Sequence, residues 1–387
     1  ILSVGYDVIN LGVVPTPAVA YLTRRYKAHA GIMISASHNP FEFNGIKVFN
    51  ADGFKLADEL EENIESMVLG EVPMPKPATG AKIGKIIHKP EAIDDYIKFV
   101  ASTTTERLDG LTVAFDCANG SSSRTAEKLF TSLGVKCVML SDKPDGTNIN
   151  AACGSTHLEN LIACVKEKKL DIGIAFDGDA DRVLCVDGDG EVVDGDMIMA
   201  ILALDMKARG RLKNNTVVGT IMTNLGFIRF CEANDIRFAA TKVGDRYVLE
   251  EMLLEDYVFG GEQSGHIIFK DFATTGDGQL SAVQLLAHIH RSGKKLAELK
   301  TVMTKYPQLI VNIRTTDAAK LAFYTDDDVR AILDEGKEKL GSHGRLVVRP
   351  SGTEPLIRIM AEGEDEAFTE AIAKQVAERI EEKLKVY

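Results

Sequence analysis

The sequence has no segment apolar enough to cross a membrane. A bilayer-spanning helix needs about 20 apolar residues, and the best candidate in this chain of 387 residues, 197–204, is short and flanked by Asp196 and Asp205. No signal peptide is recognisable either. We therefore expect a soluble protein with no membrane partner.

Positive charge is scarce. The chain has 45 lysines and arginines against 57 aspartates and glutamates, which gives a formal net charge of −12. An acidic protein repels nucleic-acid backbones and anionic lipids, so neither is expected as the main partner. If the ligand carries phosphate, the chain must gather its cations locally.

Paired cysteines and several common motifs are also missing. The six cysteines show no paired spacing, which favours free thiols in a reducing compartment and predicts a cytoplasmic protein. The chain has no Walker loop, no dinucleotide fingerprint, no serine-hydrolase elbow and no His-Glu-x-x-His motif. ATP, NAD and zinc-protease chemistry lose support accordingly.

Strand-like and helix-like segments alternate along the chain. A strand at 8–14, a helix at 17–27 and a strand at 30–34 follow the order of a βαβ unit, which predicts an α/β fold. The proline-rich stretch 71–77 is typical of a linker or surface loop. Further strands are predicted at 111–115, 172–176, 217–222, 309–314, 345–349 and 356–360, and helices near 90, 156, 196, 225 and 279.

The length of the chain exceeds that of one ordinary domain, because domains usually have about 100–200 residues. The final helix carries an apolar stripe that is typical of a packing face: Phe368, Ile372, Val376, Ile380 and Leu384. We predict four domains: 1–86, 87–191, 192–305 and 306–387.

An acidic segment directly after the predicted strand at 172–176 is the most informative part of the sequence. It has carboxylates at alternate positions, Asp177, Asp179 and Asp181, and its small spacers Gly178 and Ala180 let the backbone curl. Converging oxygen ligands suit Mg²⁺ or another hard divalent ion. The adjacent Arg182 can neutralise part of the remaining negative charge.

Other interpretations of this loop are a plain turn, an EF-hand and a phosphatase loop. An EF-hand beginning at Asp177 would need glycine at Arg182 and glutamate at Gly188, so it is excluded. Acids at the end of a buried strand are hard to leave unpaired, which argues against a plain turn. The segment 179–183 also resembles the aspartyl-phosphate loop of haloacid-dehalogenase-type phosphatases, and this alternative stays open. The segment 187–190 is more typical of a hairpin turn than of a second metal site.

A polar segment that contains Ser37 follows the predicted strand at 30–34. A junction between strand and loop would be enough to explain it. A serine oxygen, or a phosphate carried on it, would however complete the ligands of a metal held by the acidic triplet. We therefore predict that Ser37 lies against this triplet in the folded chain.

Lys47 lies ten residues beyond Ser37, after a glycine that lets the chain turn back. Most lysines are solvated, but a lysine over a partly desolvated, cation-rich pocket can lose its proton. We predict that Lys47 acts as a general base.

A glycine-rich segment at 260–266 joins two apolar runs, and a hairpin loop is the minimum explanation for it. Glu262, Ser264 and His266 alternate within it, so their polar groups could project towards one ligand. Carboxylate, hydroxyl and imidazole groups suit the vicinal hydroxyl or amine groups of a sugar.

The segment 349–355 has the composition of a phosphate-binding loop, with a plain turn as its rival. A glycine with positive φ lets successive N–H groups form an anion-binding nest, and hydroxyl and guanidinium groups add donors. The residues concerned are Arg349, Ser351, Gly352, Thr353 and Arg358. Lys242 and Arg246 would add further cations, unless Arg246 pairs with the neighbouring Asp245.

Four motifs stand in one order along nearly the whole chain: Ser35–Pro40, Asp177–Arg182, Gly261–His266 and Arg349–Pro355. Together they resemble the α-D-phosphohexomutase family. Within that family, three motif variants are similar to those of the bacterial branch that acts on glucosamine phosphates, rather than on mannose or glucose phosphates: Gly261–His266, Val243–Val248 and Arg349–Pro355.

The resemblance implies three related α/β domains with mixed sheets and a smaller α+β carboxy-terminal domain around a central cleft. In chain order, the four domains would carry the phosphoserine, the metal, the sugar and the phosphate. The implied reaction interconverts glucosamine 6-phosphate and glucosamine 1-phosphate through a phosphoserine and a 1,6-bisphosphate, which supplies UDP-N-acetylglucosamine and cell-wall synthesis. Phosphomannomutase or phosphoglucomutase activity within the same family stays an alternative.

The resemblance also implies the cofactors and the site residues. One Mg²⁺ per chain is expected, with glucosamine 1,6-bisphosphate or glucose 1,6-bisphosphate as activator, a small-molecule sugar phosphate as partner, and a homodimer as one option for the assembly. Ser37 would be phosphorylated and would bind the metal with Asp177, Asp179 and Asp181. The other implied catalytic residues are Lys47, His38 and Arg182, and the substrate-binding residues are Lys242, Arg246, Glu262, Ser264, His266, Arg349, Ser351, Gly352, Thr353 and Arg358.

The chain starts at Ile1 rather than at methionine. Members of the family that it resembles normally begin with several dozen further residues, including a strand and a Thr-Asp-Gly-x-Arg-Gly motif near the active site. We therefore expect an incomplete first domain, and reduced activity or stability of this chain.

Overall fold

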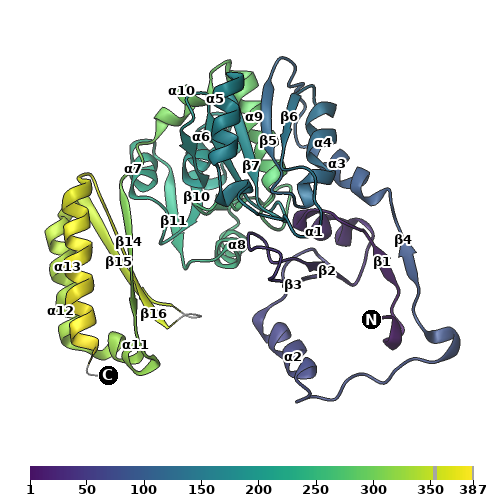
Figure 1. The fold of residues 1–387 in the computed structure, drawn as a ribbon, viewed down its shortest axis with the longest axis horizontal. Coiled ribbons are helices and arrows are strands. Elements are labelled where there is room, and N and C mark those ends of the chain that lie inside the picture. The colour runs from purple at the N-terminus through teal and green to yellow at the C-terminus, as the bar shows by residue number, and fades with distance from the viewer. Residues whose placement is uncertain (352–354, 386–387) are drawn as a thin grey trace. The chain divides into compact units, whose positions relative to one another are not determined.

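The computed structural model describes residues 1–351 and 355–385. The chain divides into two compact units, 1–218 with 244–301 and 219–243 with 302–387. Each unit is described by itself below, with the element labels of Figure 1. Within the described ranges, no helix combines the length and the apolar composition needed to cross a membrane.

Two small sheets form the beginning of the first unit. β1 (Val8–Asn10) pairs in parallel with β4 (Ile86–His88), and β2 (Ala30–Ile34) pairs antiparallel with β3 (Ile46–Asn50). The prediction of one βαβ sheet over 8–34 is therefore wrong. β2 instead forms a local hairpin with β3, which satisfies its backbone hydrogen bonds without a crossover to β1. The stretch 71–77 contains no helix or strand, as predicted. The helices are α1 (Thr16–Arg25) and α2 (Asp58–Val68).

A five-stranded mixed sheet follows, in the order β6-β5-β7-β8-β9. β5 pairs in parallel with β6 and β7, whereas β7, β8 and β9 are antiparallel, which confirms the hairpin turn predicted at 187–190. One face packs on α5, where Gly173 lies against Leu161 and Val165. On the other face, Phe115 stacks on Phe130 of α4 at 4.3 Å. The elements are α3 (Ala92–Ser102), β5 (Thr112–Asp116), α4 (Ala126–Ser132), β6 (Lys136–Leu140), α5 (Glu159–Lys168), β7 (Ile172–Phe176), β8 (Val183–Asp187) and β9 (Val192–Val193).

The last part of the first unit adds a short sheet and a long helix behind the acidic loop. β12 pairs in parallel with β10 and antiparallel with β13, and α9 contacts β7, β8 and α3. Asp277 caps α9, because its carboxylate accepts from the N–H of Leu280 and from the hydroxyl of Tyr96, both at 2.9 Å. The elements are α6 (Gly195–Ala208), β10 (Thr216–Thr220), α8 (Asp245–Leu254), β12 (Phe259–Gly261), β13 (Ile267–Phe269), α9 (Gly278–Ser292) and α10 (Leu296–Leu299).

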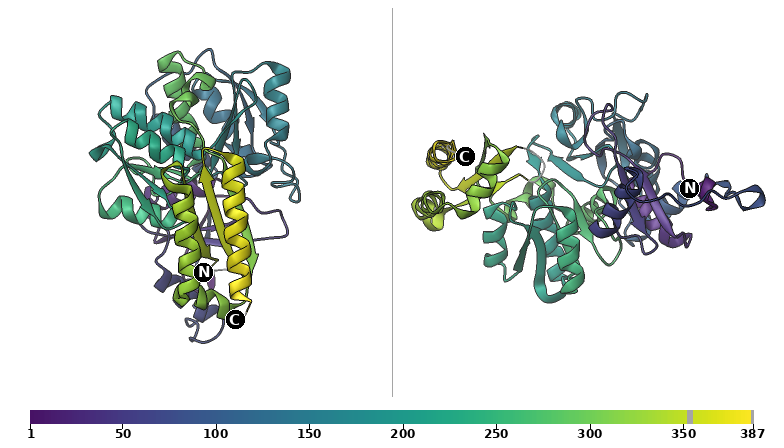
Figure 2. Two further views of the ribbon diagram at one scale, coloured as in Figure 1. Left: turned by 90° about the vertical axis from the view of Figure 1, so that its left-hand side faces the viewer. Right: turned by 90° about the horizontal axis from the view of Figure 1, so that it is seen from below.

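The second unit contains an antiparallel sheet in the order β14-β16-β15, with α12 and α13 side by side on one face (Figure 2). The stripe predicted on the final helix is buried from Ile372 to Leu384, but Phe368 is 48% exposed and does not belong to this core. The elements are α7 (Leu225–Ala233), β11 (Arg237–Thr241), β14 (Gln308–Arg314), α11 (Asp317–Thr325), α12 (Asp327–Leu340), β15 (Gly344–Pro350), β16 (Leu356–Gly363) and α13 (Glu366–Leu384).

Glu362 joins the two segments of the second unit. Its buried carboxylate accepts from Arg345 Nε at 2.6 Å, from the N–H of Leu225 at 3.2 Å and from Asn224 Nδ2 at 3.1 Å. Burial raises the pKa of Glu362, and the charge of Arg345 opposes this shift. A buried carboxylate paired in this way holds the beginning of α7 against β16.

Candidate active site

The three predicted metal ligands converge in the loop between β7 and β8. Asp177, Asp179 and Asp181 are all buried, and each offers a carboxylate oxygen within 4.8 Å of the others. The loop bends at Ala180, whose φ is +57°. Gly178 is needed for close packing, because a Cβ there would lie 2.5 Å from the carbonyl oxygen of Ser37.

Ser37 lies against this triplet, as the sequence predicts. Its hydroxyl donates to Asp177 Oδ2 at 2.7 Å. The loop that carries it follows β2 and turns sharply: Ser37 has a φ of +57°, and its N–H donates to Ser35 Oγ at 2.9 Å. The position of Ser37 therefore depends on an uncommon backbone conformation for a non-glycine residue.

Lys47 reaches the same carboxylates from β3. Its Nζ lies 2.6 Å from Asp179 Oδ2 and 3.1 Å from Asp181 Oδ2. Burial lowers the pKa of Lys47, but the charges of Asp181 and Asp179 outweigh burial and raise it. The two carboxylates therefore favour the charged form of Lys47, whereas a general base needs a lowered pKa. Release of its proton would require neutralisation of these two carboxylates.

Arg182 and His38 meet at the edge of the triplet. Arg182 Nη1 lies 3.2 Å from His38 Nδ1, and Arg182 Nε lies 4.0 Å from Asp181 Oδ1. Partial burial, followed by the charge of Arg182, lowers the pKa of His38. Both effects favour the neutral imidazole, which can accept a hydrogen bond from the Arg182 guanidinium at Nδ1.

The glycine-rich segment at 260–266 forms the predicted hairpin between β12 and β13. Its three polar side chains have different surroundings. Glu262 Oε1 accepts from the N–H of Gly244 at 3.0 Å. His266 is only 3% exposed, and its Nε2 lies 3.3 Å from Asp245 Oδ2 and 4.0 Å from Asp181 Oδ2. Ser264 Oγ is buried and has no hydrogen-bond partner within the described part of the chain.

Asp245 and Arg246 do not form the pair that was considered as an alternative. Asp245 pairs with Lys55, and Arg246 Nε donates to Glu250 Oε1 at 2.8 Å on the same helix. A cavity of about 250 Å³ is lined by residues that include Lys55, Asp245 and Arg246. Lys242 follows β11 and belongs to the second unit.

The predicted phosphate-binding segment connects β15 to β16, and Gly352 and Thr353 lie outside the described residues. Arg349 and Arg358 face each other across the two strands. Burial and the neighbouring charge of Arg358 lower the pKa of Arg349, and Arg349 Nε has no hydrogen-bond partner in the described ranges. The N–H of Ser351 donates to Leu356 O at 2.8 Å. Two adjacent cations of this kind favour an anion between them.

Two residues of the site have no counterpart among the sequence-based predictions. Thr16 donates from its hydroxyl to Asp179 Oδ2 at 2.6 Å and from its N–H to Asp179 O at 2.9 Å. Asn150 donates from its amide to Ser37 O at 2.9 Å and to Asn39 O at 2.8 Å. A threonine between two prolines at a helix start is the one local signal that marks Thr16, and no local pattern marks Asn150.

The triplet fits a divalent cation. Asp179 Oδ1 and Asp181 Oδ1 are buried and have no hydrogen-bond partner among the described residues. Burial, then the charges of Asp181 and Asp179, raise the pKa of Asp177 well above its usual range. A hard cation would satisfy the orphaned oxygens and relieve this repulsion, and oxygen-only donors are the set that Mg²⁺ prefers.

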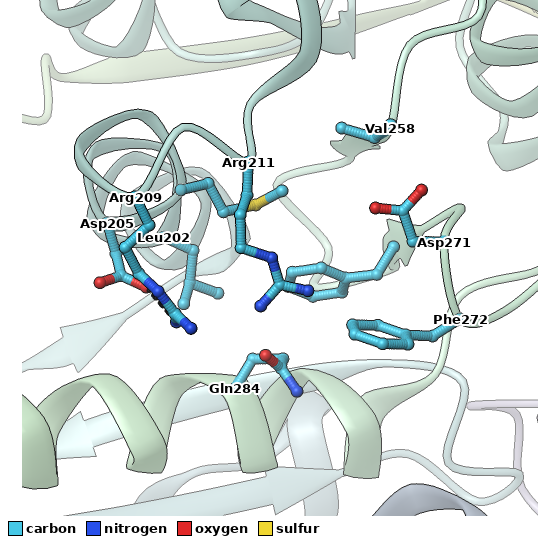
Figure 3. A pocket seen from close by; sticks show the side chains of 10 residues that line it. Leu202, Asp205, Arg209, Arg211, Val258, Asp271, Phe272 and Gln284 are labelled. Carbon is cyan, nitrogen blue, oxygen red and sulfur yellow. Dashed lines mark hydrogen bonds and ion pairs between the residues drawn. The ribbon is translucent and has the colours of Figure 1, made fainter. Parts of the chain in front are cut away.

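A separate pocket shares none of these residues. Figure 3 shows it between α6 and α9, with Arg211 and Phe272 on its wall. The guanidinium of Arg211 lies 5.7 Å from the ring centroid of Phe272. Its volume of about 10 Å³ leaves room for about one water molecule. The lining residues are Leu202, Asp205, Met206, Arg209, Arg211, Val258, Phe269, Asp271, Phe272 and Gln284.

Four family models match the chain one after another. They describe the α/β/α domains I, II and III and the C-terminal domain of phosphoglucomutase/phosphomannomutase, and they match residues 1–72, 94–190, 194–306 and 310–379. The chain belongs to the phosphoglucomutase/phosphomannomutase family. It is accordingly an isomerase of the phosphohexomutase type, and the predicted fold class of three α/β domains with a further carboxy-terminal domain is confirmed.

Curated relatives are similar to this protein over nearly the whole chain. The phosphoglucosamine mutase of Ruminiclostridium cellulolyticum is 50% identical over 385 residues, which cover 99% of this chain and 86% of that protein. The phosphoglucosamine mutase of Clostridium novyi is 50% identical over 386 residues, with coverages of 99% and 85%.

Solved structures share the fold at low identity. A phosphoglucomutase/phosphomannomutase family protein of Burkholderia thailandensis has a TM-score of 0.82 and 22% identity, and the match covers 99% of this chain and 84% of that one. The N-acetylphosphoglucosamine mutase of Aspergillus fumigatus, in complex with GlcNAc-6P and magnesium, has a TM-score of 0.72 and 18% identity, with coverages of 95% and 92%. At these identities the two structures support the fold alone.

Proposed function

We propose that this phosphohexomutase interconverts glucosamine 6-phosphate and glucosamine 1-phosphate, with Mg²⁺ at the triplet Asp177, Asp179 and Asp181. The observation that carries the proposal is the 2.7 Å hydrogen bond from Ser37 Oγ to Asp177 Oδ2, which brings a nucleophilic hydroxyl to a cluster of hard-cation ligands. The choice of sugar rests on the relatives at 50% identity, which are named phosphoglucosamine mutases.

In the proposed reaction, Ser37 carries the phosphate at the start. The O1 hydroxyl of glucosamine 6-phosphate attacks this phosphorus, the bond to Ser37 Oγ breaks, and glucosamine 1,6-bisphosphate forms. Ser37 Oγ then takes the phosphate from O6, which releases glucosamine 1-phosphate and restores the phosphoserine. When bound, Mg²⁺ would supply positive charge to the transferring phosphoryl group.

Three other side chains have roles around this transfer. Lys47 Nζ accepts the proton of the attacking sugar hydroxyl. This step requires uncharged Lys47, and therefore requires that the negative charges of Asp179 and Asp181 be neutralised. Arg182 neutralises charge at the edge of the triplet. His38 Nδ1 lies within hydrogen-bond distance of Arg182 Nη1 and orients its guanidinium.

Two further groups of residues are assigned to substrate binding, one to the sugar and one to its phosphate. Glu262, Ser264 and His266 are assigned to the sugar, and the buried position of His266 makes its role indirect, through Asp181 and Asp245. Four cations are assigned to the phosphate that is not transferred, because the same anchor must hold each end of the sugar in turn. They are Lys242, Arg246, Arg349 and Arg358, with Ser351, Gly352 and Thr353 as further donors.

We also propose glucosamine 1,6-bisphosphate or glucose 1,6-bisphosphate as activator, because either compound can transfer a phosphate to unphosphorylated Ser37. A cytoplasmic location is proposed because none of the six cysteines, all of them within the described residues, forms a disulfide. A role in the supply of UDP-N-acetylglucosamine and cell-wall synthesis follows if glucosamine phosphate is the preferred substrate.

The decisive experiment measures turnover of the 6-phosphates of glucosamine, mannose and glucose, with Mg²⁺ and a trace of bisphosphate. The highest kcat/KM is expected for glucosamine 6-phosphate, and a higher value for either hexose phosphate would overturn the choice of sugar. A phosphopeptide map made in parallel should place the acid-stable phosphate on Ser37, and Ser37→Ala should abolish turnover. An acid-labile phosphate on Asp179 or Asp181 would instead establish the phosphatase alternative.

A further inference from the structure

The loop that carries Ser37 has a backbone conformation that needs support. Ser37 has a φ of +57°, in the left-handed region that serine rarely adopts. The direction of its Oγ depends on this φ, because rotation of the backbone would carry the hydroxyl away from Asp177. Something outside the loop must therefore hold it.

Asn150 provides this contact from 113 residues further along the chain. Its Nδ2 donates to the carbonyl oxygens of Ser37 at 2.9 Å and of Asn39 at 2.8 Å. One amide group thus binds two carbonyls of the same tight loop and uses both of its hydrogens. The side chain is well placed to do so, because Asn150 is only 7% exposed.

Asn150 is itself held on the opposite side. Its N–H donates to Ala118 O at 2.9 Å, and its φ is +58°. Gly178, which lies between Asp177 and Asp179, packs closely against both residues: a Cβ at this position would lie 2.5 Å from Ser37 O and 2.8 Å from Asn150 Nδ2. The N–H of Ser121 also donates to Gly178 O at 2.8 Å. Asn150 therefore joins the serine loop to the loop after β5, at the point where both meet the acidic loop.

We propose that Asn150 is a positioning residue for phosphoryl transfer, which fixes Ser37 in its left-handed conformation so that Oγ faces the acidic triplet. This inference rests on the proposed role of Ser37 as the phosphorylated residue. Asn150 donates to main-chain carbonyls of the serine loop and, within the described part of the chain, makes no hydrogen bond to a carboxylate of the triplet, so its effect should fall on Ser37 and not on cation binding.

Two substitutions remove the amide and allow position 150 to keep its positive φ without strain. Asn150→Gly tolerates positive φ without strain, and Asn150→Asp keeps the shape and a tolerance for positive φ but replaces the donor with an oxygen. Asn148→Asp is the matched control: it makes the same chemical change two residues away, where the amide donates only locally, to Lys143 O at 3.0 Å.

The test measures the rate at which glucose 1,6-bisphosphate phosphorylates Ser37 in a single turnover of the full chain, together with kcat, KM and Mg²⁺ affinity. Both Asn150 variants should transfer phosphate at least tenfold more slowly and lower kcat to a similar extent, while KM and the dissociation constant for Mg²⁺ stay within about twofold. Asn148→Asp should match the unmodified chain.

A normal transfer rate in Asn150→Gly would overturn the inference, because the amide would then be dispensable. A parallel loss of Mg²⁺ affinity and melting temperature in both variants would also overturn it, since Asn150 would then support the whole loop cluster. Failure of the proposed function is recognised separately: in that case the unmodified chain itself would not acquire phosphate on Ser37.

Discussion

The hydroxyl of Ser37 donates a 2.7 Å hydrogen bond to Oδ2 of Asp177, across 140 residues of sequence. The two residues lie in the loop after β2 and the loop after β7, and their contact brings together the two motifs on which the proposed chemistry depends. Asp177 is fully buried, and its pKa is raised by burial and by the other two acids. A phosphate on Ser37 would thus lie beside carboxylates that need a cation.

Thr16 should control the affinity of the triplet for Mg²⁺. Thr16→Val removes the 2.6 Å hydrogen bond to Asp179 Oδ2 but keeps the bond from the N–H of residue 16. Loss of a group that orients a metal ligand typically weakens binding about 10–100-fold, and we expect a loss in this range by titration calorimetry with Mg²⁺. Thr16→Ser retains the hydroxyl and should bind normally. Equal affinity of the valine variant and the unmodified chain would contradict the prediction.

Lys47 should oppose cation binding while it supports turnover. Its Nζ lies 2.6 Å from Asp179, so a bound cation is repelled by the ammonium group. Lys47→Met removes the charge with a similar side-chain length, and we expect tighter Mg²⁺ binding together with a fall in kcat of at least about 100-fold, typical of a lost proton-transfer group. Lys47→Arg keeps the charge and should not tighten binding. Weaker binding of Mg²⁺ by the methionine variant would show that Lys47 organises the triplet instead.

Asp277 should make stability fall as pH rises through the acidic range. Burial raises the pKa of this carboxyl to about 6 from an ordinary value of 3.8. The folded chain therefore binds more protons than the unfolded chain between these values, so the contribution to the free energy of unfolding is fully present below about pH 4 and lost by about pH 6. The loss is about 3 kcal/mol.

The comparison for Asp277 is with Asp277→Asn, which can still cap α9 and does not titrate. Urea unfolding from pH 4 to pH 7 should show the difference in stability between the two chains changing across this window. Two parallel profiles would mean that Asp277 does not titrate differently in the folded and unfolded states.

Arg349 should bind an anion rather than stabilise the second unit. It faces Arg358 across β15 and β16, and its pKa is lowered by burial and by that neighbour. Arg349→Gln should raise the KM for sugar phosphate at least about tenfold, as expected for one lost charge-assisted hydrogen bond of about 1.5–3 kcal/mol. The melting temperature in phosphate-free buffer should not fall. The exposed Arg330→Gln in α12 serves as control, and an unchanged KM in Arg349→Gln would exclude the anion role.

The local sequence pattern was enough to predict most helices and strands, but it was not enough to predict which strands pair with each other. The strands at 30–34 and 172–176 and the hairpins at 187–190 and 260–266 follow from apolar runs bounded by turn residues, and the structure confirms them. The βαβ sheet predicted over 8–34 is absent, because β2 pairs with β3 and β1 with β4. Strand partners are chosen by competition among distant segments, which no local window contains.

In the candidate site, too, some residues could be predicted from local motifs and others could not. Ser37, Lys47 and the acidic triplet could be named because each belongs to a motif whose chemistry is readable in its residue types. Thr16 and Asn150 could not, because each acts through a hydrogen bond to a residue more than 100 positions away. The expectation that Glu262, Ser264 and His266 project together was drawn from alternation alone and stays a prediction, and only the tertiary structure shows that His266 is buried against Asp245.

By itself, the sequence determined the chemical inventory of this protein: three closely spaced carboxylates, a serine in a polar loop, and clusters of cations within an acidic chain. The tertiary structure alone decided which of these groups meet and in what state of charge. The physical reason is that electrostatic effects and hydrogen bonds act through space over a few ångströms, whereas the residues that make them are separated by whole domains of sequence.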